Sequence, residues 1–125
     1  MKEISIPGNS FLAVVDKVLK KKGMKAIYNV DKVGLILSRV EGFDYKESEN
    51  SGILGFLNGE EPGNGKDPLH EVEVKEGDEI SLAWIEEGSY KGDFKINKEN
   101  SVGLSLIINY KIHKEDLEIE YSILV

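Results

Sequence analysis

Residues 51–85 constrain the fold of this chain more than any other part of the sequence. They contain a short apolar run at 52–57, an Asn58-Gly59 pair, a loop rich in glycine and proline, and two segments in which apolar and polar residues alternate. An Asn-Gly pair beside apolar residues is a strong signal for a tight β-turn, and alternation predicts strands that bury one face. The stretch therefore predicts a compact β unit, and no catalytic group stands out in it.

One helix is expected, over residues 10–22, because apolar side chains recur there at i, i+3 and i+4 spacing. Asn9 or Ser10 offers an N-cap, and Gly23 is a typical residue just after a helix end. Asp16 and the lysines that follow it fall mostly on the other helix faces. The expected buried face consists of Phe11, Leu12, Val15, Val18 and Leu19.

Segments typical of β-strands account for most of the remaining chain. The last two, residues 102–112 and 117–125, are expected to pair as a C-terminal hairpin that turns at 113–116, with Ile119 and Ile123 on its apolar face. One helix with about seven or eight strands, not in βαβ alternation, predicts an α+β fold. The other expected strands are residues 2–6, 25–30, 33–40, 52–57, 71–75 and 79–84. A tight turn at Asp31-Lys32 is expected to join 25–30 to 33–40.

Length and composition narrow the functional classes. The 125 residues fit a single domain, 1–125, and we expect a monomer because the apolar strand faces can pack within the chain. A formal net charge of −7 argues against a nucleic-acid or anionic-lipid partner. The absence of cysteine excludes disulfides, thiolate catalysis and cysteine-based zinc sites.

The same sequence features bear on the location of the protein. No apolar run approaches the roughly 20 residues that span a bilayer, so we expect no membrane insertion. No signal peptide is visible in residues 1–8, which are too short and too polar for one. These observations leave two locations open, a cytoplasmic protein or a domain taken from a larger secreted one.

The motifs that suggest catalysis are weak. Residues 63–66 faintly resemble a phosphate-binding loop, but the required upstream glycine and the Ser or Thr after the lysine are missing. The only histidines, His70 and His113, are predicted at surface or edge positions, where they form neither a catalytic triad nor a metal site. We therefore expect a protein that is not an enzyme, with no catalytic and no metal-binding residue.

Two polar loops carry the remaining candidates for contact with a ligand. The carboxylates of Glu60, Glu61 and Asp67 form either a weak calcium site or a solvated acidic loop. Phe43 and Tyr45 lie in the other loop, where aromatic side chains either contact a ligand or partner or cap the sheet. Both pairs of alternatives stay open on the sequence alone.

The order of several motifs resembles that of a known family. The expected helix is followed by LSRVEG at residues 37–42, by SGILGFLNG at 51–59 and by GDEISLAW at 77–84. This order and spacing resemble the transcobalamin C-terminal-like domain family, with its pattern V-x-S-I-x-G, S-G-W-x-Y-x-V-N-G and G-D-x-I-x-W. The likeness covers residues 10–85 and implies a β-grasp-like mixed sheet packed on one helix. Residues 86–125 would then be a C-terminal β extension.

The resemblance implies a non-catalytic binding module of a bacterial secreted or surface protein. Its loops 42–51 and 60–69 would contact a small ligand, a surface protein or a glycan; the alternative is a structural spacer in a multidomain surface protein. Cobalamin enters as a ligand only through the resemblance. The Trp and Tyr that are usual in the family are Ile53 and Gly55 here, and the helical partner domain of the cobalamin carriers is absent from this chain.

Six residues are therefore candidates for binding a ligand. Trp84 also ends an amphipathic strand, so a place in the hydrophobic core is the competing expectation for it. The candidates are Phe43, Tyr45, Phe56, Asn58, Asn64 and Trp84.

Overall fold

The computed structural model describes residues 2–32, 34–44, 52–65, 67–85 and 104–125. The elements within these ranges are β1 (Glu3–Pro7), α1 (Phe11–Lys21), β2 (Lys25–Val30), β3 (Leu35–Glu41), β4 (Gly52–Leu57), the 3₁₀ turn η1 (Pro62–Gly65), β5 (Glu79–Ile85), β6 (Leu104–Lys111), the 3₁₀ turn η2 (Lys114–Asp116) and β7 (Glu120–Leu124). The strands form three antiparallel sheets, β1–β7, β2–β3 and β4–β5–β6. The predicted α+β class is confirmed. The pairings in the described ranges are all antiparallel and give three sheets, where a single mixed sheet was expected.

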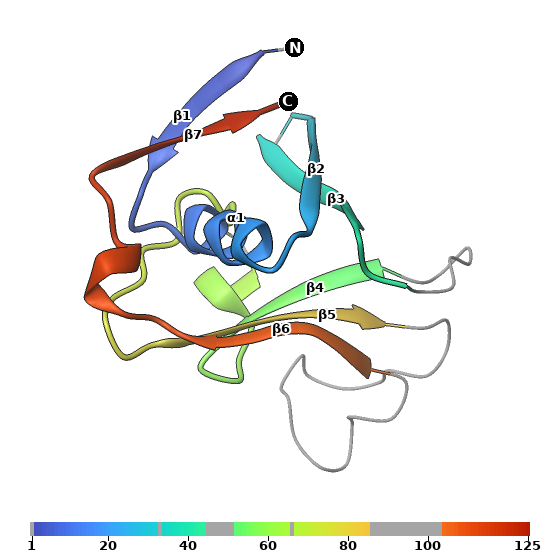
Figure 1. Cartoon of the computed structure of the whole chain (residues 1–125). Coiled ribbons are helices and arrows are strands. Elements are labelled where there is room, and N and C mark those ends of the chain that lie inside the picture. Colours follow the sequence, from blue (N-terminus) through green and yellow to red (C-terminus); the bar gives the residue numbers. More distant parts are fainter. Residues whose placement is uncertain (1, 33, 45–51, 66, 86–103) are drawn as a thin grey trace.

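Helix α1 lies between the three-stranded sheet on one side and the two smaller sheets on the other (Figure 1). One face of the helix packs against the core residues of β5 and β6. The opposite face packs against β1, β2, β3 and β7. A helix covered on two sides needs apolar residues around more of its circumference than one stripe. For this reason Ala13 and Val14 are buried together with the five residues of the predicted face.

Both ends of α1 follow the sequence prediction. The Ser10 hydroxyl accepts a hydrogen bond from the Ala13 N–H, and Gly23 adopts a φ of 76° just after the helix. The first two helical N–H groups, on Phe11 and Leu12, donate to the carbonyls of Val72 and Leu69. Residues 69–72 therefore occupy the N-terminus of the helix, and its free N–H groups are used within the chain.

The two predicted tight turns form as expected. Asn58 and Gly59 have φ values of 53° and 80°, which are those of a type I′ turn, and Leu57 and Glu60 exchange two backbone hydrogen bonds across it. Strands β2 and β3 form a hairpin whose turn is closed by hydrogen bonds between Asp31 and Gly34. Since both turns depend on neighbouring residues only, the sequence was sufficient to predict them.

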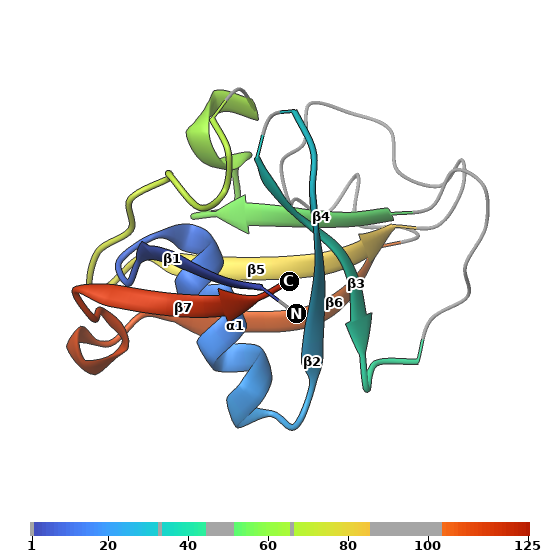
Figure 2. The ribbon, with the colours of Figure 1, turned by 90° about the horizontal axis from the view of Figure 1, so that it is seen from above.

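The expected C-terminal hairpin is wrong. Strand β6 pairs with β5, and β7 pairs with β1 at the opposite side of the molecule, so that the two chain ends lie side by side (Figure 2). The apolar faces of β6 and β7 cover different sides of α1. This arrangement buries more apolar surface than a two-stranded hairpin on its own would bury. Ile119 precedes β7 and is 93% exposed, whereas Ile123 within β7 is buried. Of the predicted apolar face, Leu117 and Tyr121 are partly buried as well, so Ile119 is the member that departs from the prediction.

The expected strand at residues 71–75 is also wrong, although its buried residues were identified. Val72 and Val74 are buried, but only an isolated bridge between Ser10 and Glu73 forms there. The Val72 carbonyl and the Val74 N–H instead bond to Phe11 and Asn9 at the start of α1. Alternation indicated which side chains are buried, but the backbone of this segment caps a helix.

Candidate functional site

Strand β3 passes over β4, an edge strand of the three-stranded sheet (Figure 2). Residues of both strands line an apolar groove. It encloses about 280 Å³. Nine of the described residues line it, eight of them without a charge, and they come from three parts of the chain. They are Leu35, Ile36 and Leu37 of β3; Ile53, Gly55 and Leu82 of the central sheet; and Asp67, Pro68 and Leu69 of the loop after η1. This set of residues is called the β3–β4 groove below.

Gly55 lines the groove without contributing a side chain to it. In the β4–β5 register Gly55 lies opposite Leu82, on the face of the sheet that packs on α1. A Cβ added at Gly55 would lie 2.8 Å from Cε1 of Phe11, closer than two carbon atoms approach. The Phe11 ring therefore occupies the space that a side chain at position 55 would need.

The loop wall is held by backbone contacts. The Asp67 N–H donates to the Gly63 carbonyl at 3.3 Å, and the Glu71 N–H donates to the Pro68 carbonyl at 2.9 Å. Leu69 is fixed to the first turn of α1 by its carbonyl, and Gly63 packs against the Asp67 side chain with a φ of 64°. Because the loop is anchored at both ends, the groove is preformed.

A second hollow continues the groove around η1. It encloses about 210 Å³ and shares four lining residues with the β3–β4 groove, namely Ile53, Gly55, Asp67 and Leu69. Its further lining residues are Leu54, Phe56, Glu61 and Pro62. Among the described lining residues of the two hollows, the charged ones are Asp67 and Glu61, both carboxylates and both exposed.

The six candidate residues do not form a single site. Phe56 is fully buried, and Trp84, only 6% exposed, packs in the core beneath α1. Phe43 is half-buried against the same core. Tyr45 and the side chain of Asn64 lie outside the part of the chain that the structure describes.

Asn58 has an evident structural role. Its side-chain oxygen accepts a hydrogen bond from the Glu79 N–H at 2.9 Å, and its amide nitrogen donates to Asp78 at 3.2 Å. These bonds fix the Asn58-Gly59 turn to the start of β5. Asn58 is thus engaged within the chain by the same side-chain groups that a ligand would use.

Of the two predicted loops, residues 60–69 supply part of the groove and residues 42–51 lie mostly outside the described ranges. Sequence reasoning did not select Leu35, Ile36, Leu37 or Ile53 as lining residues. The one signal that points to them is a glycine at position 55 within an otherwise apolar run, because a glycine inside a strand often marks a close approach of another group.

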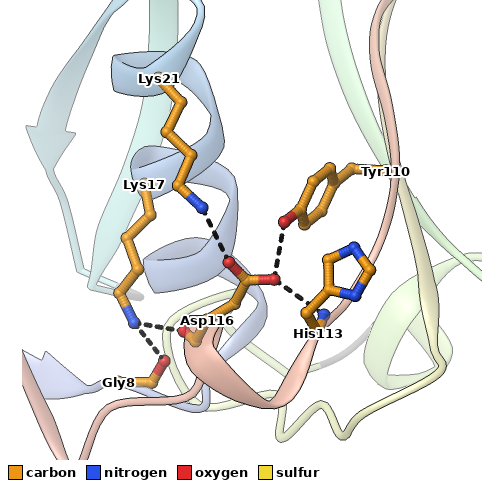
Figure 3. Close-up of polar contacts among 6 residues, drawn as sticks. All are labelled: Gly8, Lys17, Lys21, Tyr110, His113 and Asp116. Carbon is orange, nitrogen blue, oxygen red and sulfur yellow. Dashed lines mark hydrogen bonds and ion pairs between the residues drawn. The ribbon is translucent and has the colours of Figure 1, made fainter.

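Asp116 is the centre of a polar cluster that joins η2 to α1 (Figure 3). Its carboxylate accepts hydrogen bonds from Lys21 Nζ at 3.0 Å, from the Tyr110 hydroxyl at 2.8 Å and from the His113 N–H at 2.8 Å. Lys17 Nζ donates to the carbonyls of Gly8 and Asp116. Burial alone would raise the pKa of Asp116, but the donated hydrogen bonds and the Lys21 charge outweigh it and lower the pKa.

Asp16 corrects the prediction for the polar face of the helix, because it is buried although it was expected on an outer face. Its carboxylate accepts hydrogen bonds from the hydroxyls of Tyr28 and Tyr121, and Lys20 Nζ lies 3.1 Å away. Burial, followed by the Asp16 charge, raises the pKa of Tyr28 far above its ordinary value. Asp16 therefore links α1 to β2 and β7.

The histidines lie apart from these clusters. His113 is exposed, and its backbone N–H, not its ring, contacts Asp116. His70 Nε2 lies 3.9 Å from the largely exposed carboxylate of Glu71, which is too long for a hydrogen bond. Among the described residues no group of three or more His, Cys, Asp or Glu side chains is arranged to hold a metal ion.

Comparison with known proteins identifies no relative that would explain the groove or the polar clusters. No protein-family model, no curated protein and no solved structure matches the chain. The likeness to the transcobalamin C-terminal-like family therefore stays a prediction from the sequence. In the part of the chain that the structure describes, α1 is too short to cross a membrane.

Proposed function

We propose that this protein is a non-catalytic binding module and that the β3–β4 groove is its binding site. One observation carries the proposal: a preformed hollow of about 280 Å³ with an aliphatic lining lies between secondary-structure elements that are fixed to one another. Small-molecule sites are concave and mostly apolar, with a few polar groups and volumes of about 300–1,000 Å³. The volume of the groove lies just below that range, which suits a short aliphatic ligand or one side chain of a partner protein.

The proposal also includes the cellular location of the protein and the family that it resembles. We place the module in a secreted or cell-surface bacterial protein, with a cytoplasmic protein as the alternative, and we retain the transcobalamin C-terminal-like family and its β-grasp-like arrangement. Support comes from α1 packed across β4–β5–β6 and from the Asn58-Gly59 turn at its place in the motif order. Cobalamin itself finds little support, because a corrin ring exceeds the size of ligands that a hollow of about 280 Å³ encloses.

Binding in the groove is tested by NMR titration of the ¹⁵N-labelled chain with hexanol, cyclohexanol, benzyl alcohol and cobalamin. We expect saturable shifts for the alcohols, with Kd values in about the millimolar range for ligands this small. The shifts should concentrate in residues 35–37, 53–55 and 67–69.

Two variants that fill the groove sharpen the test. Ile53→Trp places a large ring on the floor, and Ile36→Trp places one on a wall position that is already 42% exposed, where the fold tolerates it. Both should abolish the shifts, whereas Ile119→Trp at an exposed site should not. Flat titrations with all four compounds would refute the binding proposal and favour the structural spacer.

A further inference from the structure

The charged residues around the β3–β4 groove determine which charge on an apolar ligand is favoured there. Within the part of the chain that the structure describes, no Lys or Arg lines the groove or the hollow that continues it. The two charged lining residues are the carboxylates of Asp67 and Glu61. A ligand in the groove therefore meets aliphatic side chains along its length and negative charge at the end near η1.

We propose that the β3–β4 groove takes an aliphatic cation, with the alkyl part on Ile53 and Leu82 and the ammonium group beside Asp67. This inference rests on the binding function proposed for the same groove. It commits to a free primary alkylamine as the ligand that is recognised.

The position of Asp67 favours recognition of a charged group. Asp67 lines both hollows, so it lies where they meet. Its backbone N–H is bonded to the Gly63 carbonyl, and Pro68 restricts its backbone to extended conformations. The carboxylate is exposed and therefore keeps its hydration until a ligand arrives, so an incoming ammonium group loses little solvation beside it.

The opposite charge is disfavoured for the same reason. An anionic ligand of equal length would place its carboxylate beside Asp67 and Glu61, and no described lining residue carries a positive charge to compensate. The helix N-terminus offers no alternative, because the Phe11 and Leu12 N–H groups are bonded to the Val72 and Leu69 carbonyls. A neutral alcohol would gain the apolar contacts alone.

The test compares hexylamine, hexanol and hexanoate, which share one alkyl chain, by NMR titration of the full chain at pH 7 and low salt. We expect hexylamine to bind about threefold more tightly than hexanol, the factor typical of an exposed ion pair, and hexanoate to bind most weakly. The preference for the amine should shrink as salt is added.

Asp67→Asn keeps the shape of the side chain and removes its charge. It should bring hexylamine to the affinity of hexanol and leave hexanol unchanged, and Glu61→Gln should act in the same direction. Glu115→Gln on η2, which lines neither hollow, is the matched control and should leave all three affinities unchanged.

The possible failures are distinguishable. If hexanol binds as tightly as hexylamine and Asp67→Asn has no effect, the cation preference is wrong and the binding function stands. If none of the three compounds shifts the groove resonances, the binding function itself fails. Shifts of those resonances with protein concentration alone would assign the groove to a second copy of the chain and overturn the proposal.

Discussion

Gly55 determines, as a single residue, both the packing of the core and the shape of the groove. Phe11 is fully buried, and its ring lies within 2.8 Å of the place that a Cβ at position 55 would take. A ring in a close-packed core cannot move aside without displacing its neighbours. The same glycine therefore allows α1 to approach β4, and it lines the β3–β4 groove without a side chain.

Gly55→Ala is expected to destabilise the fold by about 1–3 kcal/mol, because the added methyl group overpacks the core against Phe11. The measurement is urea-induced unfolding followed by tryptophan fluorescence. Gly52→Ala is the control in the same strand, since an added Cβ there meets nothing within 4 Å. Its effect should stay within about 0.5 kcal/mol. Equal losses in the two variants would show that Phe11 does not constrain position 55.

At the scale of elements, the polar clusters show how short segments are attached to α1. The η2 turn is only three residues long, yet its Asp116 is bonded to Lys21 on the helix and to Tyr110 on β6. Asp16 does the same for β2 and β7 through two tyrosine hydroxyls. Buried carboxylates that accept several hydrogen bonds are costly to leave unpaired, and they therefore favour one relative placement of the elements.

Asp116→Asn is expected to cost about 1.5–3 kcal/mol of the free energy of unfolding near neutral pH, because charge-assisted hydrogen bonds are lost. The variant should also lose part of the pH dependence. The pKa of Asp116 is lowered in the folded state, so its contribution is present above the ordinary pKa of 3.8 and is lost as the pH falls below it.

The pH dependence is measured by urea unfolding at pH 6 and at pH 3. The difference in free energy of unfolding between the two pH values should be smaller in Asp116→Asn than in the unaltered chain. Glu115→Gln, at the neighbouring exposed position, should keep the full difference. An unchanged difference in Asp116→Asn would mean that the carboxylate is not preferentially ionised in the folded state.

For the whole molecule, α1 is the part on which both hydrophobic clusters depend. One cluster joins the helix to β5 and β6, and the other joins it to the two smaller sheets. Seven apolar helix residues are almost completely removed from solvent. Opening of either outer sheet exposes part of the helix, but the helix itself is released only when both clusters are lost.

Native-state hydrogen exchange tests this arrangement. The amides of Val15, Val18 and Leu19 should exchange only through global unfolding, with an opening free energy equal to that from urea unfolding. The amides of Ile4 and Ile123 in the β1–β7 sheet should exchange through smaller openings, because a two-stranded sheet is marginal on its own. Faster exchange in α1 than in β1–β7 would contradict the central role of the helix.

The sequence by itself determined the features that depend on near neighbours. The helix at 10–22 with its Ser10 cap, the β2–β3 hairpin and the Asn58-Gly59 turn are all predicted and confirmed, because capping, periodicity and turn conformation involve residues a few positions apart. Alternation also identified buried side chains such as Val72 and Ile123. It could not identify their partners, since it shows which face of a segment is apolar and not what covers that face.

Only the tertiary structure decided the features that depend on distant contacts. Strand β6 joins β5 and β7 joins β1, although the sequence favoured pairing the two C-terminal segments with each other. Asp16 is buried because Tyr121, which is 105 residues away, donates a hydrogen bond to it. The β3–β4 groove likewise exists because β3, β4 and residues 67–69 meet around a glycine. Such a meeting depends on how whole elements pack, and no local pattern encodes it.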